Sequence, residues 1–144
     1  MITRSTKTFI TLFFLISSMP AYSSQSKDVK LLVSANKLKS LGYADGYVGS
    51  INVDLNGDGK ADVIKYTYLN ASPPGTCDQS DCMSDLNNSP ILTFQIRMHS
   101  GKTVDGSFMC TSLGVFKKTK NGMNNLFCGP KHMLHWNGDT YDTN

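Results

Sequence analysis

Nine residues, Asp54 to Asp62, constrain the fold of this chain more than any other segment. They place side-chain oxygens at positions 1, 3, 5 and 9 of the segment and glycines at positions 4 and 6. Oxygens at alternate positions meet at one point only where the backbone curls tightly, and glycine accepts the positive φ angles that such a curl needs. Hard cations such as Ca²⁺ bind six to eight oxygen ligands, so the segment predicts a calcium loop. The predicted ligands are Asp54, Asn56, Asp58, the carbonyl of Lys60, and Asp62.

The alternative for these residues is an ordinary turn, because Asn, Gly and Asp also dominate turns that bind no metal. Four oxygen-bearing side chains at ligand spacing are more than a turn requires, so we favour the metal. The loop differs from an EF-hand, because Lys65 stands where a bidentate glutamate is needed and the chain contains no glutamate. The residues that follow, Val63 to Leu69, are mostly β-branched or aromatic and predict a strand.

A calcium loop that leads into a strand resembles the FG-GAP or VCBS-type repeat. The resemblance covers residues 49–64, which read Gly-Ser-Ile-Asn-Val-Asp-Leu-Asn-Gly-Asp-Gly-Lys-Ala-Asp-Val-Ile. In that family the loop binds Ca²⁺ between two strands of a propeller blade. The chain shows one copy, whereas a propeller needs about four blades or more. The resemblance therefore implies a calcium site, but neither a propeller nor a catalytic activity.

The N-terminal residues 1–23 predict a secretory signal peptide. A basic start is followed by a short apolar run, Phe9 to Ile16, and by small residues suited to cleavage before Ser24. The alternative, a membrane anchor, is disfavoured because the run is well short of the ~20 residues that span a bilayer. No cysteine lies near the cleavage site, so no lipid anchor is expected. We expect residues 24–144 to form one domain, periplasmic or extracellular, without a stable membrane anchor.

Four cysteines in an exported chain predict two disulfides. We favour pairing between neighbours in sequence, Cys77 with Cys82 and Cys110 with Cys128, although four cysteines allow three connectivities. Without the signal peptide the chain has twelve basic residues against eleven acidic ones. This balance predicts no nucleic-acid partner, because nucleic-acid binding usually requires a clustered basic face.

The pattern along the chain predicts an α+β or mainly β fold, with an N-terminal helix and a disulfide-bonded antiparallel sheet of hairpins. Residues 28–41 show helical spacing of apolar residues, although a strand could begin at Leu31. Residues 47–69 predict a hairpin with the calcium loop at its tip. Residues 70–90 predict a long, polar, disulfide-clipped loop, and residues 91–144 predict further antiparallel strands.

Two features of the C-terminal half set the expected sheet. Residues 91–99 alternate apolar and polar side chains, which predicts a half-buried strand. Asn121-Gly122 predicts a two-residue hairpin turn, and Asn137-Gly138 a second, smaller hairpin. A two-residue turn at Asn121 places Val115 opposite Cys128, which conflicts with a bond from Cys128 to Cys110. Either the register differs or Cys110 lies on a bend outside the pair, and the sequence leaves both open.

The sequence favours a non-catalytic exported domain that binds a protein or another component of the cell envelope. The acidic side chains of the long loop are the candidate partner contacts, namely Asp78, Asp81 and Asp85. One alternative is a periplasmic inhibitor or immunity-type protein. Another is a small metal-dependent hydrolase that uses the aspartates of the calcium loop with a histidine. A third is a fragment-like relative of a repeat protein that self-associates.

Zinc chemistry and nucleophilic catalysis have weaker signals. His132 and His135 form an HxxH pair, but the segment around them is too short for the stable helix on which two such histidines share a face. The chain has neither an HExxH motif nor a GxSxG motif. We therefore expect no catalytic residues, and the discriminating observation is whether a histidine lies beside the aspartates in a deep pocket.

Overall fold

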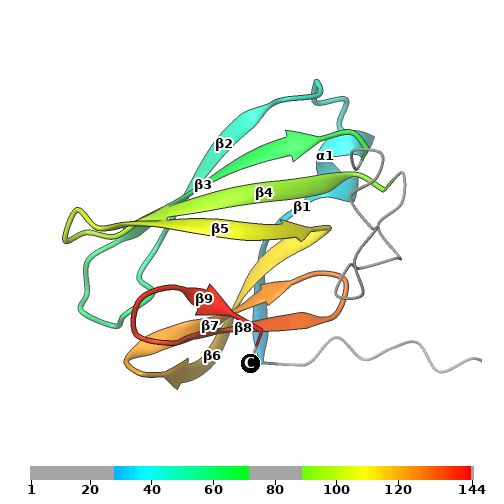
Figure 1. Ribbon diagram of the computed structural model, residues 1–144. Helices are drawn as coiled ribbons and strands as arrows, with labels where there is room; N and C mark the ends of the chain where they lie inside the picture. Colours follow the sequence, from blue (N-terminus) through cyan, green and yellow to red (C-terminus); the bar gives the residue numbers. More distant parts are fainter. Residues whose placement is uncertain (1–27, 72–88, 144) are drawn as a thin grey trace, which may run out of the picture.

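The computed structural model describes residues 28–71 and 89–143 as two packed antiparallel sheets with one short helix (Figure 1). The four-stranded sheet has the order β2-β3-β4-β5, and the five-stranded sheet has the order β1-β6-β7-β8-β9. The four-stranded sheet contains β2 (Val48–Val53), β3 (Asp62–Leu69), β4 (Ile91–Arg97) and β5 (Thr103–Cys110). The five-stranded sheet contains β1 (Val29–Ser34), β6 (Ser112–Lys120), β7 (Met123–Cys128), β8 (His132–Trp136) and β9 (Tyr141–Asp142).

The core lies between the two sheets, because every second side chain of the central strands points inward. On β3, Ile64, Tyr66 and Tyr68 are buried, whereas Lys65 between them is exposed. On β4, Leu92, Phe94 and Ile96 are buried, as the alternation in residues 91–99 predicted. Inward side chains of the other sheet complete the same cluster, namely Leu113, Val115, Leu126 and Leu134. This one-sided burial gives each sheet an outer face that points away from the other sheet.

The predicted helix over residues 28–41 is wrong in its first half. Val29–Ser34 is a strand that pairs with β6, and only Ala35–Ser40 is helical (α1). The local sequence Leu31-Leu32-Val33 is compatible with a helix and with a strand. It forms a strand because it pairs with the long neighbouring strand β6. The helix buries Ala35 and Leu38 against the core and ends at Ser40, two residues before Gly42, whose φ is 77°. The fold is therefore mainly β with one short helix.

The hairpin from β6 to β7 resolves the conflict over Cys128. The predicted turn is present, since Asn121 and Gly122 have φ angles of 52° and 78°. The pairing then shifts between Val115 and Thr119, so that Leu113 rather than Val115 lies opposite Cys128. Cys110 ends β5, and Thr111 forms a corner at which the chain passes from one sheet to the other. The different register is therefore correct, and Cys110 lies outside the β6–β7 pair, although as the last residue of β5 rather than on the bend itself.

The disulfide between Cys110 and Cys128 is confirmed, and it joins the two sheets. The expected bond between Cys77 and Cys82 lies outside the described residues. The small C-terminal hairpin is confirmed as β8 and β9, and Trp136 and Tyr141 lie buried with their rings 5.3 Å apart. Within residues 28–71 and 89–143, no helix is long and apolar enough to cross a membrane.

Candidate metal centre

The loop from Asp54 to Ala61 connects β2 to β3 at the end of the four-stranded sheet. Gly57 and Gly59 have φ angles of 73° and 81°, which is the left-handed conformation that the sequence required of them. The carboxylate of Asp54 accepts the N–H of Gly57 at 2.7 Å and the N–H of Gly59 at 2.8 Å. The backbone therefore curls around the side chain of Asp54.

Asn56 and Asp58 follow on the exposed side of this curl. The side-chain oxygen of Asn56 accepts the N–H of Asp58 at 3.1 Å, and Oδ1 of Asp58 accepts the N–H of Lys60 at 2.7 Å. The bond from the N–H of Lys60 lowers the pKa of Asp58, to which the Asn56 amide and the charges of Lys60 and His99 also contribute. Asp58 is therefore an anion at neutral pH and a poor general acid.

Asp62 differs from the other predicted ligands because it is fully buried. Its Oδ2 accepts the N–H of Leu55 at 3.0 Å, and its Oδ1 accepts the N–H of His99 at 2.8 Å. A buried carboxylate is tolerated only where such donors compensate its lost hydration. Asp62, the first residue of β3, thus connects the end of the loop to its beginning and to the turn that follows β4.

Leu55 connects the loop to the second sheet. Its side chain is fully buried in the core, and its carbonyl accepts the N–H of Asn124 on β7 at 2.7 Å. This role could not be predicted from the sequence, because a single leucine in a polar loop carries no register information. The same holds for the N–H groups of His99 and Asn124, which only the packing of distant strands brings to the loop.

The side chains of the loop suit a hard cation, but they are engaged in hydrogen bonds with the backbone. All of the predicted ligand atoms are oxygens, as Ca²⁺ requires. In the part of the chain that the structure describes, no three His, Cys, Asp or Glu side chains stand together as a ready metal site. A carboxylate that accepts one N–H bond keeps further lone pairs. Metal binding would therefore require the half-buried Asp54 and the exposed Asp58 to share or exchange their N–H partners.

The histidines do not assemble a catalytic pocket with these aspartates. His99 donates its backbone N–H to Asp62, and the residue is exposed to solvent. His132 and His135 lie on β8 of the other sheet, where residues three apart face opposite sides. The geometry thus provides side-chain oxygens, held by backbone N–H groups, on a loop between strands. The predicted partner contacts lie outside the described residues, namely Asp78, Asp81 and Asp85.

Comparison of this chain with protein-family models, with curated proteins and with solved structures finds no match.

Proposed function

We propose that this protein is a small exported domain, without catalytic activity, whose Asp54–Asp62 loop binds Ca²⁺ as a structural ion. Its task is recognition of another macromolecule at the cell envelope or outside the cell. The signal-peptide pattern, the Cys110–Cys128 disulfide and the oxygen-rich loop support this proposal. Inhibitors and immunity-type proteins of the envelope are one form that such recognition takes.

The observation that carries the proposal is the attachment of the loop to both sheets. Leu55 binds β7 through its carbonyl and Asp62 holds the turn after β4 through its carboxylate. An ion held by Asp54, Asn56 and Asp58 would shield the carboxylates of Asp54 and Asp58 from each other and restrain the loop between the two anchors. The consequence would be a more stable sandwich rather than an activated water, because the carboxylates of Asp54 and Asp58 are already held by backbone N–H groups.

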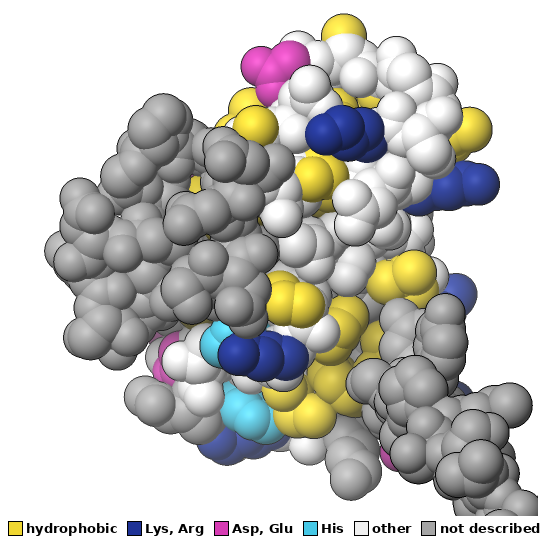
Figure 2. All heavy atoms as spheres, turned by 90° about the vertical axis from the view of Figure 1, so that its right-hand side faces the viewer, with side chains coloured by type: hydrophobic (Ala, Val, Ile, Leu, Met, Phe, Trp, Pro, Cys, Tyr) yellow, Lys and Arg dark blue, Asp and Glu magenta, His cyan; other side chains and the backbone are white. Residues whose placement is uncertain are grey.

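The surface gives no separate support for a nucleic-acid partner. On the face in Figure 2, lysine and arginine side chains are spread apart from one another rather than gathered in a stripe. Nucleic-acid affinity depends on several cations placed together along phosphates. A protein, or another component of the envelope, is therefore the partner class that we favour.

The calcium proposal is tested by thermal unfolding in excess chelator and in millimolar Ca²⁺. The missing bidentate glutamate predicts weak affinity, on the order of 10⁻⁴ to 10⁻³ M as for extracellular modules. At free Ca²⁺ of ~100 times the dissociation constant, binding would add roughly 2.7 kcal/mol to the free energy of unfolding. Mg²⁺ should replace Ca²⁺ poorly, because it requires a tighter octahedron and holds its water.

Asp58→Ala should abolish the rise in melting temperature that Ca²⁺ causes, because it deletes an exposed central ligand. Asp105→Ala, which removes an exposed carboxylate of β5 outside the loop, is the matched control and should keep the full response. Identical melting curves for the wild-type protein in chelator and in Ca²⁺ would show that the loop is only a turn.

Export is tested separately by the intact mass and thiol content of the protein recovered from the periplasm or the medium. We expect a mature chain that begins near Ser24 and has no free thiol under denaturing, non-reducing conditions. Retention of residues 1–23 in the membrane fraction, or two or more free thiols per chain, would contradict this part of the proposal.

A further inference from the structure

The strand β2 forms an edge of the four-stranded sheet and lacks the usual protection of an edge. It reads Val-Gly-Ser-Ile-Asn-Val, without a charged residue or a proline. The other three edges differ: β1 has Lys30 and a register shift, β5 has Asp105 and a register shift beside it, and β9 has two residues. Charges, irregular pairing and short length are the devices that keep edges from pairing with other chains.

The hydrogen-bonding groups on the open side of β2 belong to Val48, Ser50 and Asn52. The N–H of Tyr68 donates to the carbonyl of Tyr47 at 2.7 Å, which fixes the alternation of the antiparallel ladder. In this register Gly49, Ile51 and Val53 bond to β3, and the alternate residues direct their N–H and C=O groups away from it. Across the described ranges, these alternate residues make no backbone bond beyond the sheet.

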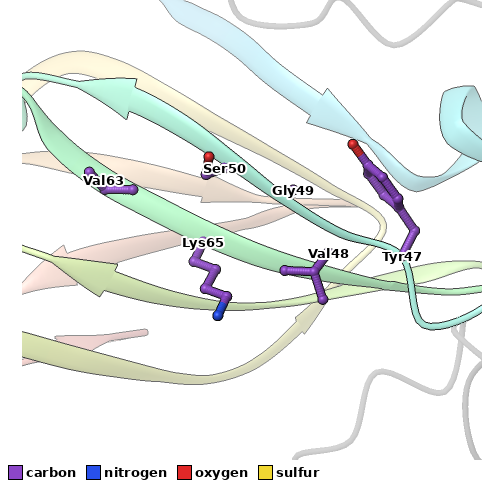
Figure 3. A pocket seen from close by; sticks show the side chains of 6 residues that line it. All are labelled: Tyr47, Val48, Gly49, Ser50, Val63 and Lys65. Carbon is purple, nitrogen blue, oxygen red and sulfur yellow. The ribbon is translucent and has the colours of Figure 1, made fainter.

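A groove of about 510 Å³ lies along this edge and carries a cation. It is lined by Tyr47, Val48, Gly49, Ser50, Val63 and Lys65, and Figure 3 shows Val48 and Lys65 on the same side of the ribbon. Lys65 is exposed and makes no ion pair with the described residues. The nearby carboxylate of Asp105 instead binds the amide of Gln95 at 2.5 Å. The charge of Lys65 is thus available to an acidic group.

Exposed apolar side chains occur at the start of the same strand and just before it. Leu41, Tyr43 and Val48 are 59%, 39% and 49% exposed, and they are three of the four large apolar side chains exposed within the described chain. The rings of Tyr43 and Tyr47 lie 4.4 Å apart. Sheet edges that bind extended peptides combine unpaired backbone N–H and C=O groups with exposed aromatic and aliphatic side chains.

We propose that the open edge of β2 binds an extended acidic segment of another protein as an added strand of the four-stranded sheet. Main-chain bonds to Val48, Ser50 and Asn52 supply the affinity, while a carboxylate of the segment meets Lys65 and an apolar side chain meets Val48. A second copy of this chain fits less well, because β2 has no acidic residue to offer Lys65. This inference rests on the proposal that the domain acts by recognition, but it is independent of the calcium loop.

The test uses the oxidised protein and a short synthetic peptide of alternating valine and threonine with two central aspartates. Titration followed by backbone amide NMR should shift and protect the amides of Val48, Ser50 and Asn52. The same peptide with lysines in place of the aspartates should bind more weakly. Lys65→Ala should lower the affinity for the acidic peptide about two- to five-fold, as expected for an exposed ion pair. It should not lower the affinity for the lysine peptide.

Ser50→Pro is the blocking variant, because it removes an N–H on the open side and leaves the bonds to β3 in place. It should lower the affinity for the acidic peptide more than about tenfold, whereas the matched control Ser50→Thr should stay within about twofold. Should Ser50→Pro unfold, the Lys65→Ala comparison still decides the proposal.

Three results would overturn the inference. One is no binding at millimolar peptide, and another is amide shifts that lie away from β2. The third is a wild-type dimer that Ser50→Pro converts to a monomer, because this result would assign the edge to a second copy. All titrations are repeated in chelator and in Ca²⁺. If the peptide binds but Ca²⁺ has no effect on stability, the inference about β2 stands and the calcium proposal fails. If Ca²⁺ stabilises the protein but the peptide does not bind, only the inference about β2 fails.

Discussion

The ring of Tyr66 on β3 lies directly over Gly49, the residue opposite it on β2. A methyl group on Gly49 would come within 2.8 Å of Cε1 of that ring. Glycine therefore leaves room for an aromatic side chain that fills the end of the core beneath the edge strand. The relationship also sets how much change the edge tolerates, because Gly49 faces inward while its neighbour Ser50 faces outward.

Gly49→Ala should lower the free energy of unfolding by about 1–3 kcal/mol, because the added methyl group displaces the ring of Tyr66. Urea unfolding measures the loss. Ser50→Ala, one residue further along the same strand and on its outer face, is the control and should stay within about 0.5 kcal/mol of wild type. Equal stability of Gly49→Ala and wild type would mean that the ring moves aside without cost.

The pKa of Tyr66 is raised above its ordinary value, first because the side chain is buried and then because of Tyr47 and Tyr43 nearby. A raised pKa in the folded state means that folding favours the neutral phenol. Its contribution to stability is complete below the unfolded pKa of 10.0 and is lost as the pH rises toward the folded pKa. We therefore expect the free energy of unfolding to fall at alkaline pH.

Tyr66→Phe should reduce this alkaline loss while changing the stability at neutral pH little, because the described residues provide no hydrogen bond to the Tyr66 hydroxyl. Urea unfolding of both proteins from pH 7 to 11 measures the difference. Part of the loss should remain in Tyr66→Phe, since the pKa values of Tyr68 and Tyr141 are also raised, chiefly by burial. Parallel pH profiles for the two proteins would contradict the assignment to Tyr66.

Asp62→Asn should lower the free energy of unfolding by about 1–3 kcal/mol in excess chelator. The side-chain NH₂ of asparagine would face the backbone N–H of either Leu55 or His99 and leave that buried N–H without an acceptor. Urea unfolding measures the change, and Asp105→Asn, which exchanges an exposed carboxylate, should change it by less than about 0.5 kcal/mol. A loss seen only in the presence of Ca²⁺ would mean that Asp62 acts as a ligand alone.

Replacement of both Cys110 and Cys128 by alanine should cost about 3 kcal/mol of stability. The bond closes a loop with a sequence separation of 18 residues, and the chain-entropy estimate for such a loop is about 3 kcal/mol. Denaturant unfolding of the oxidised proteins measures the cost. A Cys77→Ser/Cys82→Ser variant is the control and should lose less, because a bond between these residues would close a much shorter loop. A larger loss in the control would contradict the entropic account.

The strands that the sequence predicted correctly are those with strong local signals. Residues 91–99 alternate so regularly that burial of one face followed from the pattern, and Leu92, Phe94 and Ile96 are buried accordingly. The turn at Asn121-Gly122 followed from residues that accept positive φ. The segment 28–41 was misjudged because its apolar residues suit both periods, and the partner strand that decides for β lies some eighty residues further along the chain.

The sequence by itself determined the chemistry of the loop, the positions of its glycines and the pairing of Cys110 with Cys128 as the favoured connectivity. These follow from side-chain type and from neighbours in the chain, which the sequence states directly. Only the tertiary structure decided that Leu55 and Asp62 attach the loop to both sheets, that the register shifts before Cys128, and that β2 is an open edge. Each of these depends on contacts between residues far apart in sequence, whose geometry is set by the packing of the two sheets rather than by local preference.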